Sequence, residues 1–477
     1  MRVRRHLSIA AGTAAVAAAV AGGPAAAAGG SAAASGGGPA AAVVRISPDA
    51  VHAMPVDRAG PPSTQTCESQ FKIACYTPVQ VQQAYNTPRL YRQGITGAGQ
   101  TIVIVDSFGS PTVQADLAKF DATFHLPAPP HFVIAQPAGK VPPYQANANR
   151  EGWAGETDLD VEYAHAMAPG ANILLVETPT SENEGTTGFP QIVKAEESVI
   201  NAHLASVISQ SFSATEQTFA SKQALLNLRG AYVDAARHGV TVLAASGDSG
   251  AADVKFDQTT YYLHPVTSWP DSDPLVTGVG GTQLHEPVRG GAPWTSTVWN
   301  DTYNLPTNRY IFGNDGPNPL AGGGGKSVIF ARPRYQNGVS GVVGGQRGVP
   351  DISMSGACNG AVDMYQSFPG QTAGWYPTCG TSEATPLFAG VVALADQIAG
   401  HPLGLINPAL YQMSAAHRWG IVDVVKGNNT VSFLQSGEHT VRGFAARPGY
   451  DLASGVGTVN AYYFAYRLAG KEPAPVP

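Results

Sequence analysis

Short apolar runs alternate with longer amphipathic stretches through the first half of the chain. The apolar runs are rich in β-branched residues, are bounded by turn residues and cover residues 100–106, 172–176, 206–210 and 240–245. Runs of this kind predict buried strands. Helical patterns occupy residues 157–167, 191–203 and 222–238. The alternation predicts an α/β fold, in which helices flank a central, mostly parallel sheet and the active site forms at the carboxyl ends of the strands.

A further apolar run, residues 386–398, predicts a buried helix with Pro386 in its first turn. It follows a turn of small residues that contains Ser382. A serine at this place lies at the positive end of the helix dipole, where negative charge is stabilised. Ser382 is therefore a candidate nucleophile. The segment equally fits an N-cap serine, and taken alone it leaves both interpretations open.

The predicted helix 157–167 and the residue before it carry a pair of acidic residues, Glu156 and Asp160. Residues four apart share one helix face, so the two carboxylates repel and one holds a proton more tightly than the other. Such a pair suits acid–base chemistry. The alternative is that acidic residues in a first helical turn only complement the dipole. A third acidic candidate, Asp248, follows the strand 240–245 in a glycine-rich turn, where aspartate is also a common turn residue.

Composition narrows the class of protein. The chain has 477 residues, of which 13% are charged, and a formal net charge of −6. Without a basic stripe to neutralise phosphates, nucleic acid is not an expected partner. The four cysteines fall into two close pairs, Cys67/Cys75 and Cys358/Cys379. Disulfides within these pairs suit an exported protein, although four cysteines allow three connectivities.

The N-terminus carries an export signal. Arginines at positions 2, 4 and 5 precede an alanine-rich apolar run and small residues near position 28. We expect a signal peptide at 1–28, a low-complexity leader or short pro-segment at 29–66 and a folded domain at 67–477. The paired arginines fit the twin-arginine route, and the ordinary secretory route fits nearly as well. The apolar run is too short to predict a membrane span, so the expected location is extracellular.

Several motifs together resemble the sedolisin family, the serine-carboxyl peptidases with a subtilisin-like fold. They occur in the family's order from about Cys75 to the C-terminus: Glu156-x-x-x-Asp160 with Ala168-Pro169-Gly170-Ala171; Ser246-Gly247-Asp248-Ser249-Gly250; Trp269-Pro270 with Val279-Gly280-Gly281-Thr282; Pro350-Asp351-Ile352-Ser353; Gly380-Thr381-Ser382; and Asn407-Pro408-Ala409-Leu410-Tyr411. The resemblance implies a three-layer, subtilisin-like fold and a secreted endopeptidase that works in acid.

The resemblance also implies roles. Ser382 corresponds to the nucleophile, Glu156 to its general base and Asp160 to the partner that orients Glu156. Asp248 corresponds to the acid that helps form the oxyanion hole. A carboxylate can accept a hydroxyl proton, and an aspartic acid can stabilise an oxyanion only while it is protonated. We expect polypeptide substrates, no nucleic-acid or membrane partner, and a monomer.

A calcium site is implied as well. The ligands that match the family's C-terminal metal loop are Asp423, Val424, Arg447, Gly449 and Asp451. Two carboxylates and main-chain carbonyls are hard oxygen donors, and glycine lets the backbone bend around one structural Ca²⁺ ion. Without the resemblance these residues are typical of ordinary surface turns.

Two rival interpretations remain. A subtilisin-like Ser/His/Asp protease could use Asp106 as its acid, but His165 lies within the acidic helix rather than at the start of a helix. The other rival interpretation is a catalytically inactive binding protein on the same fold.

The sedolisin family usually carries a long folded propeptide, whereas here only the short leader precedes the domain. Either folding proceeds unaided or the helper is a separate molecule.

Overall fold

The computed structural model describes residues 51–52, 60–285 and 296–473. The predicted signal peptide at 1–28 and most of the predicted leader at 29–66 therefore lie outside the described residues. All described elements belong to one compact unit, Ala42–Pro477.

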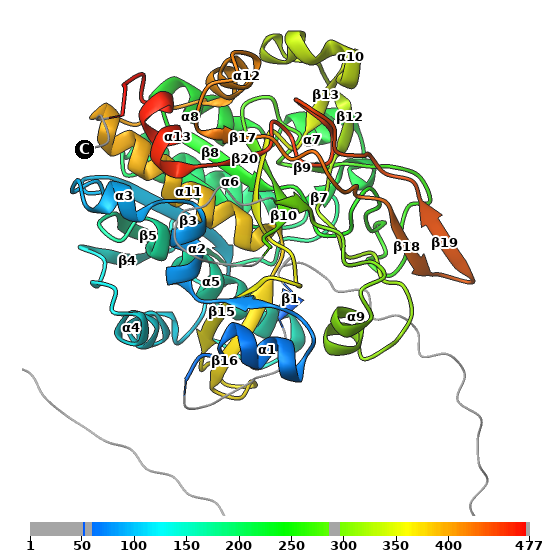
Figure 1. The fold of residues 1–477 in the computed structure, drawn as a ribbon, viewed down its shortest axis with the longest axis horizontal. Helices are drawn as coiled ribbons and strands as arrows, with labels where there is room; N and C mark the ends of the chain where they lie inside the picture. The colour runs from blue at the N-terminus through cyan, green and yellow to red at the C-terminus, as the bar shows by residue number, and fades with distance from the viewer. Residues whose placement is uncertain (1–50, 53–59, 286–295, 474–477) are drawn as a thin grey trace, which may run out of the picture. The chain divides into compact units, whose positions relative to one another are not determined.

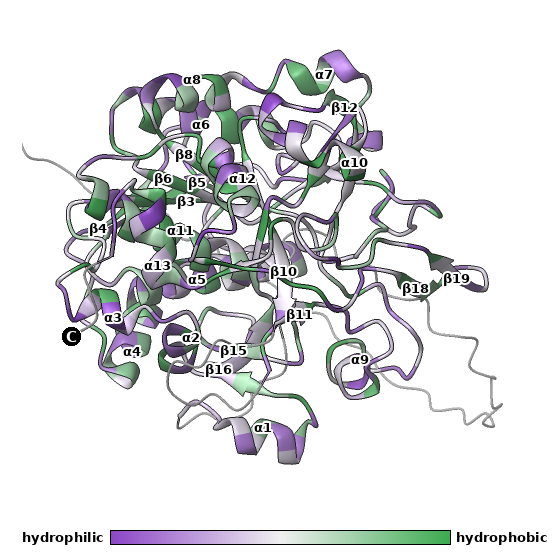
Figure 2. Ribbon diagram, turned by 45° about the horizontal axis from the view of Figure 1, so that its top comes forward, coloured by the Kyte–Doolittle hydropathy of each residue, from purple (hydrophilic) through white to green (hydrophobic). Residues whose placement is uncertain are grey.

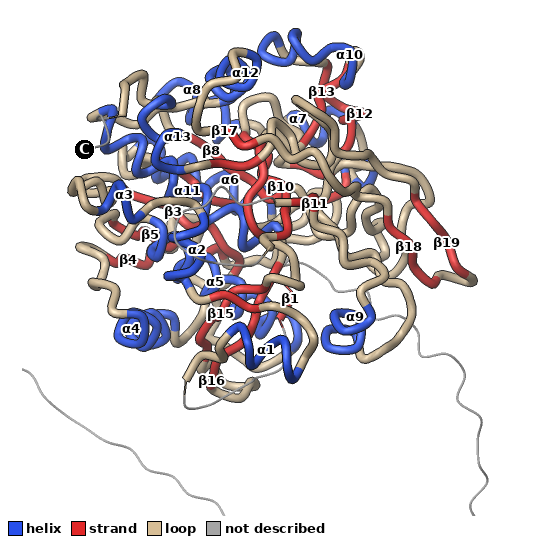
Figure 3. The backbone as a smooth tube through the Cα atoms, in the orientation of Figure 1, coloured by secondary structure: helices blue, strands red, loops and turns tan. Residues whose placement is uncertain are grey.

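The centre of this unit is a mostly parallel sheet (Figures 1 and 3). Its strands follow the order β11-β10-β8-β6-β3-β5-β4, and β14 pairs with β10. Only β11 pairs antiparallel within this sheet. The bounds are β3 Thr101–Ser107, β4 Phe132–Ala135, β5 Asn172–Thr178, β6 Val207–Gln210, β8 Thr241–Ala245, β10 Thr277–Gln283, β11 Thr297–Val298 and β14 Ile352–Ser355. The four strands predicted from apolar runs are confirmed to within two residues at each end.

Helices cover both faces of the sheet, as predicted. Alternate residues of β3 show why: Ile102 and Ile104 pack with one hydrophobic core, while Val103 and Val105 pack with a second. The first core includes side chains of α5 (Ala148–Met167) and α11 (Thr381–Ala399). The second includes side chains of α6 (Phe189–Asn201) and α8 (Gly230–His238). In Figure 2 the central strands are mostly green, whereas purple segments lie mainly on the outer helices.

Two predicted helices differ from the structure. The helix predicted at 157–167 begins at Ala148, where Asn147 caps it through a hydrogen bond from the Arg150 amide (3.1 Å). Glycines 152 and 155 obscured this first half in the sequence, because glycine has low helix propensity. The helix predicted at 222–238 is interrupted: α7 (Lys222–Leu226) ends before α8 begins.

A smaller sheet carries the chain to Ser382. Its order is β1-β16-β15-β2, with β1 Val51–His52, β2 Cys75–Tyr76, β15 Ala361–Gln366 and β16 Gly374–Cys379. Both disulfides expected within the cysteine pairs are confirmed, Cys67–Cys75 and Cys358–Cys379. The second one fastens the end of β16 two residues before Thr381. Strand β1, which falls within the predicted leader, was not anticipated from the sequence.

The remaining elements surround these two sheets. The helices are α1 Thr64–Gln70, α2 Pro78–Ala84, α3 Pro88–Tyr91, α4 Val113–Phe124, α9 Leu305–Phe312, α10 Ser340–Val343, α12 Asn407–Ala415 and α13 Ala461–Leu468, with short 3-10 turns η1 Glu216–Thr218 and η2 Arg334–Val339. The strands are β7 Ala214–Thr215, β9 Ser268–Trp269, β12 Gly325–Ala331, β13 Gln346–Val349, β17 Ile421–Val422, β18 Val431–Leu434, β19 Glu438–Val441 and β20 Thr458–Val459. Among the described residues, no helix has the length and apolar character that crossing a bilayer requires.

Candidate active site

Ser382 lies in the first turn of α11, not in a loop before the helix. The N-cap position belongs to Gly380, whose φ of 131° is accessible to glycine but strained for other residues. The Gly380 amide donates to the Gly356 carbonyl (2.9 Å), which fixes the turn. Ser382 is fully buried, and its Oγ makes no hydrogen bond with any described residue. The N-cap interpretation of Ser382 is therefore wrong.

The prediction for Pro386 also needs correction. Because α11 begins at Thr381, Pro386 is its sixth residue and lies inside the helix rather than in the first turn. Proline has no amide hydrogen, so the helix cannot provide the usual i+4 donor for the carbonyl of Ser382. The Oγ of Ser211 lies 3.5 Å from this carbonyl oxygen.

Glu156 and Asp160 lie in the middle of α5, and both are fully buried. They cannot serve as first-turn acids that complement the helix dipole, so that alternative is wrong. Helix α5 packs directly on α11: a Cβ placed on Gly390 would lie 2.4 Å from Cβ of Met167. The acidic pair thus lies on a helix in contact with the one that carries Ser382. One oxygen of Asp160 accepts a hydrogen bond from Ser211 Oγ (2.9 Å).

Asp248 approaches Ser382 from the carboxyl end of β8, where the sequence placed it. Its Oδ1 accepts hydrogen bonds from the amide of Thr381 (2.7 Å) and from the hydroxyl of Thr381 (2.8 Å). The Gly247 amide in turn donates to that hydroxyl (3.1 Å). The residue immediately before Ser382 is therefore fastened to Asp248 by two hydrogen bonds.

The electrostatics of the site favour protonated carboxyl groups. Burial raises the pKa of Asp160 well above its ordinary value, the negative charge of Asp106 raises it further, and the Ser211 hydrogen bond partly offsets both. Burial also raises the pKa of Asp106 to about 7, against a lowering by the Thr157 hydrogen bond. Asp106 lies on β3. The carboxyls around α5 thus hold their protons more tightly than carboxyls in water.

Sequence reasoning missed two residues of this site. Glu383, directly after Ser382, is fully buried, and burial raises its pKa, with a further increase from the charge of Asp248. Ser211 directly follows β6 and contacts both Asp160 and Ser382. Its position after a parallel strand was the available signal, since active-site residues gather at the carboxyl ends of such strands.

The residues expected to bind calcium lie on two segments, one directly after β17 and the other after β19, and a hydrogen bond joins the two segments. The Gly449 amide donates to Asp423 Oδ2 (2.8 Å), and the Arg447 amide donates to Asp451 Oδ2 (3.0 Å). No described residue donates a hydrogen bond to the carbonyl oxygens of Val424, Arg447 or Gly449. Open carbonyls beside two carboxylates fit the oxygen ligands that Ca²⁺ prefers.

The residues proposed for a Ser/His/Asp triad do not meet. His165 Nε2 lies 2.7 Å from the Pro127 carbonyl oxygen and 3.3 Å from Asp121 Oδ1. Asp106 instead raises the pKa of Asp160. These contacts give the subtilisin-like triad no support.

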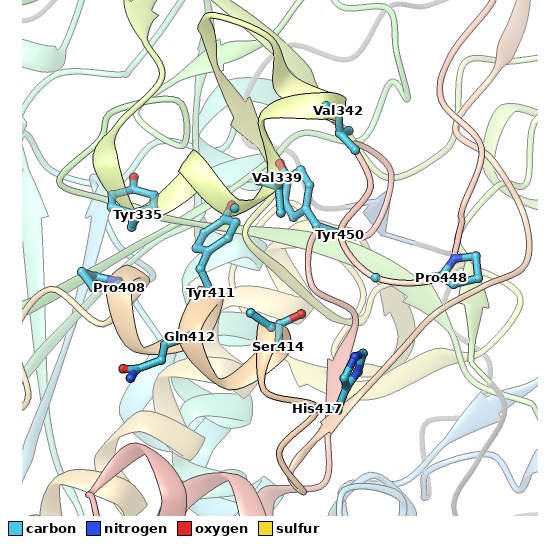
Figure 4. A pocket seen from close by; sticks show the side chains of 14 residues that line it. Tyr335, Val339, Val342, Pro408, Tyr411, Gln412, Ser414, His417, Pro448 and Tyr450 are labelled. Atoms are coloured by element: carbon cyan, nitrogen blue, oxygen red, sulfur yellow. The ribbon is translucent and has the colours of Figure 1, made fainter.

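One cavity is not lined by any of the four candidate catalytic residues (Figure 4). Its volume is about 560 Å³. The lining comes from η2, α10, α12 and the loop of the expected calcium site, and includes Tyr335, Tyr411, His417, Gly449 and Tyr450. None of Glu156, Asp160, Asp248 and Ser382 lines it.

Comparisons with known proteins agree with this geometry. The family model described as the subtilase family matches residues 145–404. Kumamolisin of Bacillus sp. (strain MN-32) is 32% identical over 80% of this chain and 62% of its own length. Sedolisin of Pseudomonas sp. (strain 101) is 30% identical over 64% of this chain and 48% of its own length. Tripeptidyl-peptidase 1 of Homo sapiens is 30% identical over 64% of this chain and 50% of its own length.

A solved structure of Pseudomonas sedolisin, a serine-carboxyl proteinase in complex with two molecules of pseudo-iodotyrostatin, superposes with a TM-score of 0.68 at 25% identity. The match covers 82% of this chain and 97% of that one. The chain spans 48% to 62% of the length of these curated relatives. It belongs to the subtilase family and, within that family, to the sedolisins.

Proposed function

We propose that this protein is a secreted serine-carboxyl endopeptidase that acts in acid. The observation that carries the proposal is the hydrogen bonding around Ser382. Asp248 holds the neighbouring Thr381 by two hydrogen bonds. The Ser211 hydroxyl contacts both Asp160 and the carbonyl oxygen of Ser382. Acids from the turn after β8 and from α5 thus contact the start of α11, directly through Thr381 or through Ser211. Similarity to kumamolisin and to the sedolisins supports the same class of reaction.

In the proposed reaction, Glu156 is ionised and accepts the hydroxyl proton of Ser382 as Oγ attacks the peptide carbonyl. Asp160, four residues along α5, sets the proton affinity of Glu156. The C–N bond breaks when the leaving amine receives that proton, and an acyl-enzyme ester on Ser382 remains. Water then hydrolyses the ester by the same route, with Glu156 again accepting and returning a proton.

Asp248 acts as a protonated donor to the developing oxyanion. Because its Oδ1 accepts two hydrogen bonds from Thr381, the acid proton belongs on Oδ2. An ionised Asp248 would repel the oxyanion, whereas a protonated one stabilises it. Glu156 must be ionised while Asp248 is protonated, so the rate rises and then falls between two carboxyl titrations.

The test is a pH–rate profile on a denatured protein substrate, with Ser382→Ala as the inactive control. We expect a bell-shaped dependence of rate on pH, with its maximum at acidic pH. A maximum at or above neutrality would overturn the role of Asp248. Titration with an aldehyde or boronate inhibitor separates the enzyme from an inactive binding protein on the same fold, because only the enzyme is stoichiometrically titrated.

We further propose one structural Ca²⁺ ion held by Asp423, Asp451 and the carbonyls of Val424, Arg447 and Gly449. Support comes from the open carbonyls and from the two carboxylates, whose segments are joined by the hydrogen bond from Gly449 to Asp423. Export is also a proposal, and the two disulfides are consistent with an oxidising compartment.

A further inference from the structure

Ser211 links two parts of the site that the chain order keeps far apart. It follows β6 directly and is fully buried. Its Oγ donates to Asp160 Oδ1 (2.9 Å), which lies on α5. The same Oγ lies 3.5 Å from the carbonyl oxygen of Ser382, which lies on α11. One hydroxyl thus contacts both the partner of the general base and the backbone of the nucleophile.

The Ser382 carbonyl is open to this contact because of Pro386. In a regular helix the amide four residues along would donate to that carbonyl. Pro386 occupies that position inside α11 and has no amide hydrogen. A buried carbonyl without a donor is unfavourable, so a donor from outside the helix stabilises this turn.

A hydroxyl has one proton, and therefore Ser211 responds to the charge on Asp160. While Asp160 is ionised, the Ser211 proton points to its carboxylate. When Asp160 is protonated, the acid can donate to Ser211 Oγ, and the Ser211 proton is then available to the Ser382 carbonyl. The hydrogen bond that Ser211 donates to the Ser382 carbonyl therefore depends on whether Asp160 is protonated.

The charged groups around Asp160 come from the neighbouring elements. Asp106 faces it from β3 and Glu156 lies one turn away on α5. From α11 the acidic Glu383 interacts instead with Ser355 and Asp248. Burial raises the pKa of Asp160 first, Asp106 raises it further, and the hydrogen bond from Ser211 is the contact that lowers it.

We propose that Ser211 is a positioning residue of the catalytic centre, which holds Asp160 in place and anchors the Ser382 carbonyl that Pro386 leaves open. The inference rests on the proposed peptidase function. Ser211 does not touch substrate in this scheme, and it acts through Asp160 and through the turn of Ser382.

The first experiment compares Ser211→Ala with Ser209→Ala by full pH–rate profiles on the intact chain. Ser209 lies on β6 two residues earlier, is equally buried, and its Oγ bonds to no described residue. We expect Ser211→Ala to lower kcat about tenfold, as for loss of a hydrogen bond to an ionised group, with little change in KM. The acidic limb should move up by about one pH unit, because the ionised pair loses a donor. Ser209→Ala should change neither.

A second comparison separates the effect of the hydroxyl group from the effect of altered packing. Ser211→Thr and Ser211→Val have nearly the same size and differ in the hydroxyl. We expect the threonine variant to exceed the valine variant in kcat about tenfold and to keep the acidic limb at its original pH. Equal profiles for the pair would overturn the inference, as would a normal profile for Ser211→Ala or an equal loss in Ser209→Ala.

The carbonyl contact has its own test. Pro386→Ala restores an amide at the position that normally donates to the Ser382 carbonyl. Added to Ser211→Ala, it should recover part of kcat but leave the acidic limb shifted. No recovery would overturn the anchoring role. Wild-type protein that lacks Ser382-dependent hydrolysis would instead overturn the proposed function, so the two failures are distinguishable.

Discussion

At the residue scale, the proposed catalytic centre combines a serine with carboxyl groups rather than with a histidine. Glu156 and Asp160 are fully buried on one helix, and Asp248 holds the residue before Ser382. Burial raises the pKa of Asp160, and the proposed mechanism needs one carboxylate and one carboxylic acid at the same time. In the proposed mechanism, activity is lost when Asp248 ionises, because its carboxylate would repel the oxyanion.

We predict that Glu156→Gln abolishes most turnover while the fold remains. The amide keeps the shape of the side chain but cannot accept the Ser382 proton, so kcat should fall by about 10²–10⁴-fold or more. Asp160→Asn should cost less, because it alters the proton affinity of the base without removing it. The measurement is kcat at the acidic optimum, with melting temperature as the control for folding. Near-normal turnover of Glu156→Gln would disprove the assigned base.

At the scale of elements, the contact between α5 and α11 sets the distance between the acidic pair and Ser382. Gly390 permits this contact, since a Cβ there would lie 2.4 Å from Met167 Cβ and 3.3 Å from the Ala164 carbonyl oxygen. Both helices pack in the same hydrophobic core on one face of the sheet. Displacement of either helix therefore changes the position of the acidic pair relative to Ser382 as well as the packing.

We predict that Gly390→Ala lowers both stability and kcat. The extra methyl group overpacks the interface, which typically costs about 1–3 kcal/mol, and it moves α11 away from α5. Small displacements of reacting groups reduce rates strongly. Gly341→Ala is the matched control, because Gly341 also lies in a helix, α10, and has open space around it. Equal melting temperatures and equal kcat in the two variants would contradict this account.

The calcium loop is a second prediction at this scale. If Ca²⁺ binds the native state only, it stabilises the fold by mass action, by about 2.7 kcal/mol when the free ion is at 100 times its Kd. Chelation should then lower the melting temperature of the wild type, and Asp451→Ala should have a similar effect. Asp423→Ala is the sharper variant, because the Asp423 side chain is exposed and, among the described residues, accepts a hydrogen bond only from the Gly449 amide.

In Asp423→Ala the effect of chelation should largely disappear, while the melting temperature without calcium should stay close to that of the chelated wild type. Melting curves recorded with and without a chelator provide both values. A wild-type melting temperature that does not respond to the chelator would show that no stabilising ion is bound.

At the scale of the whole molecule, we expect buried carboxyls outside the candidate active site to make the folded state more stable in acid. Burial raises the pKa of Asp396 to about 8 and is the main cause that raises the pKa of Glu184 to about 10. In an unfolded chain these groups titrate near pH 4. Below about pH 4 both states are protonated, and the folded state keeps its full stability. As pH rises, the unfolded state releases protons first, so stability is lost towards each folded-state pKa.

We therefore predict a higher melting temperature at pH 4 than at pH 7.5. Asp396→Asn should reduce this difference, because it removes one group that must stay protonated. Asp257→Asn is the control, because the pKa of Asp257 is shifted in the opposite direction. Asp257 is exposed, and hydrogen bonds, chiefly from the Thr259 amide, lower its pKa to about 2. Its removal should not reduce the difference. Greater stability at pH 7.5 than at pH 4 would refute the prediction.

The sequence by itself determined the features that depend on near neighbours. Apolar runs predicted β3, β5, β6 and β8, and the ordered motifs predicted the family to which the chain belongs. Cysteines separated by 8 and by 21 residues paired as expected, since short loops close easily.

Only the tertiary structure decided how distant residues meet. Ser211 reaches Asp160 across 51 positions and Ser382 across 171 positions, and no local pattern encodes such contacts. The sequence also left open whether Ser382 was a cap and whether the acidic pair complemented a dipole. The starting points of α5 and α11 excluded both alternatives, because glycines and a proline hide helix ends that side-chain packing and capping define.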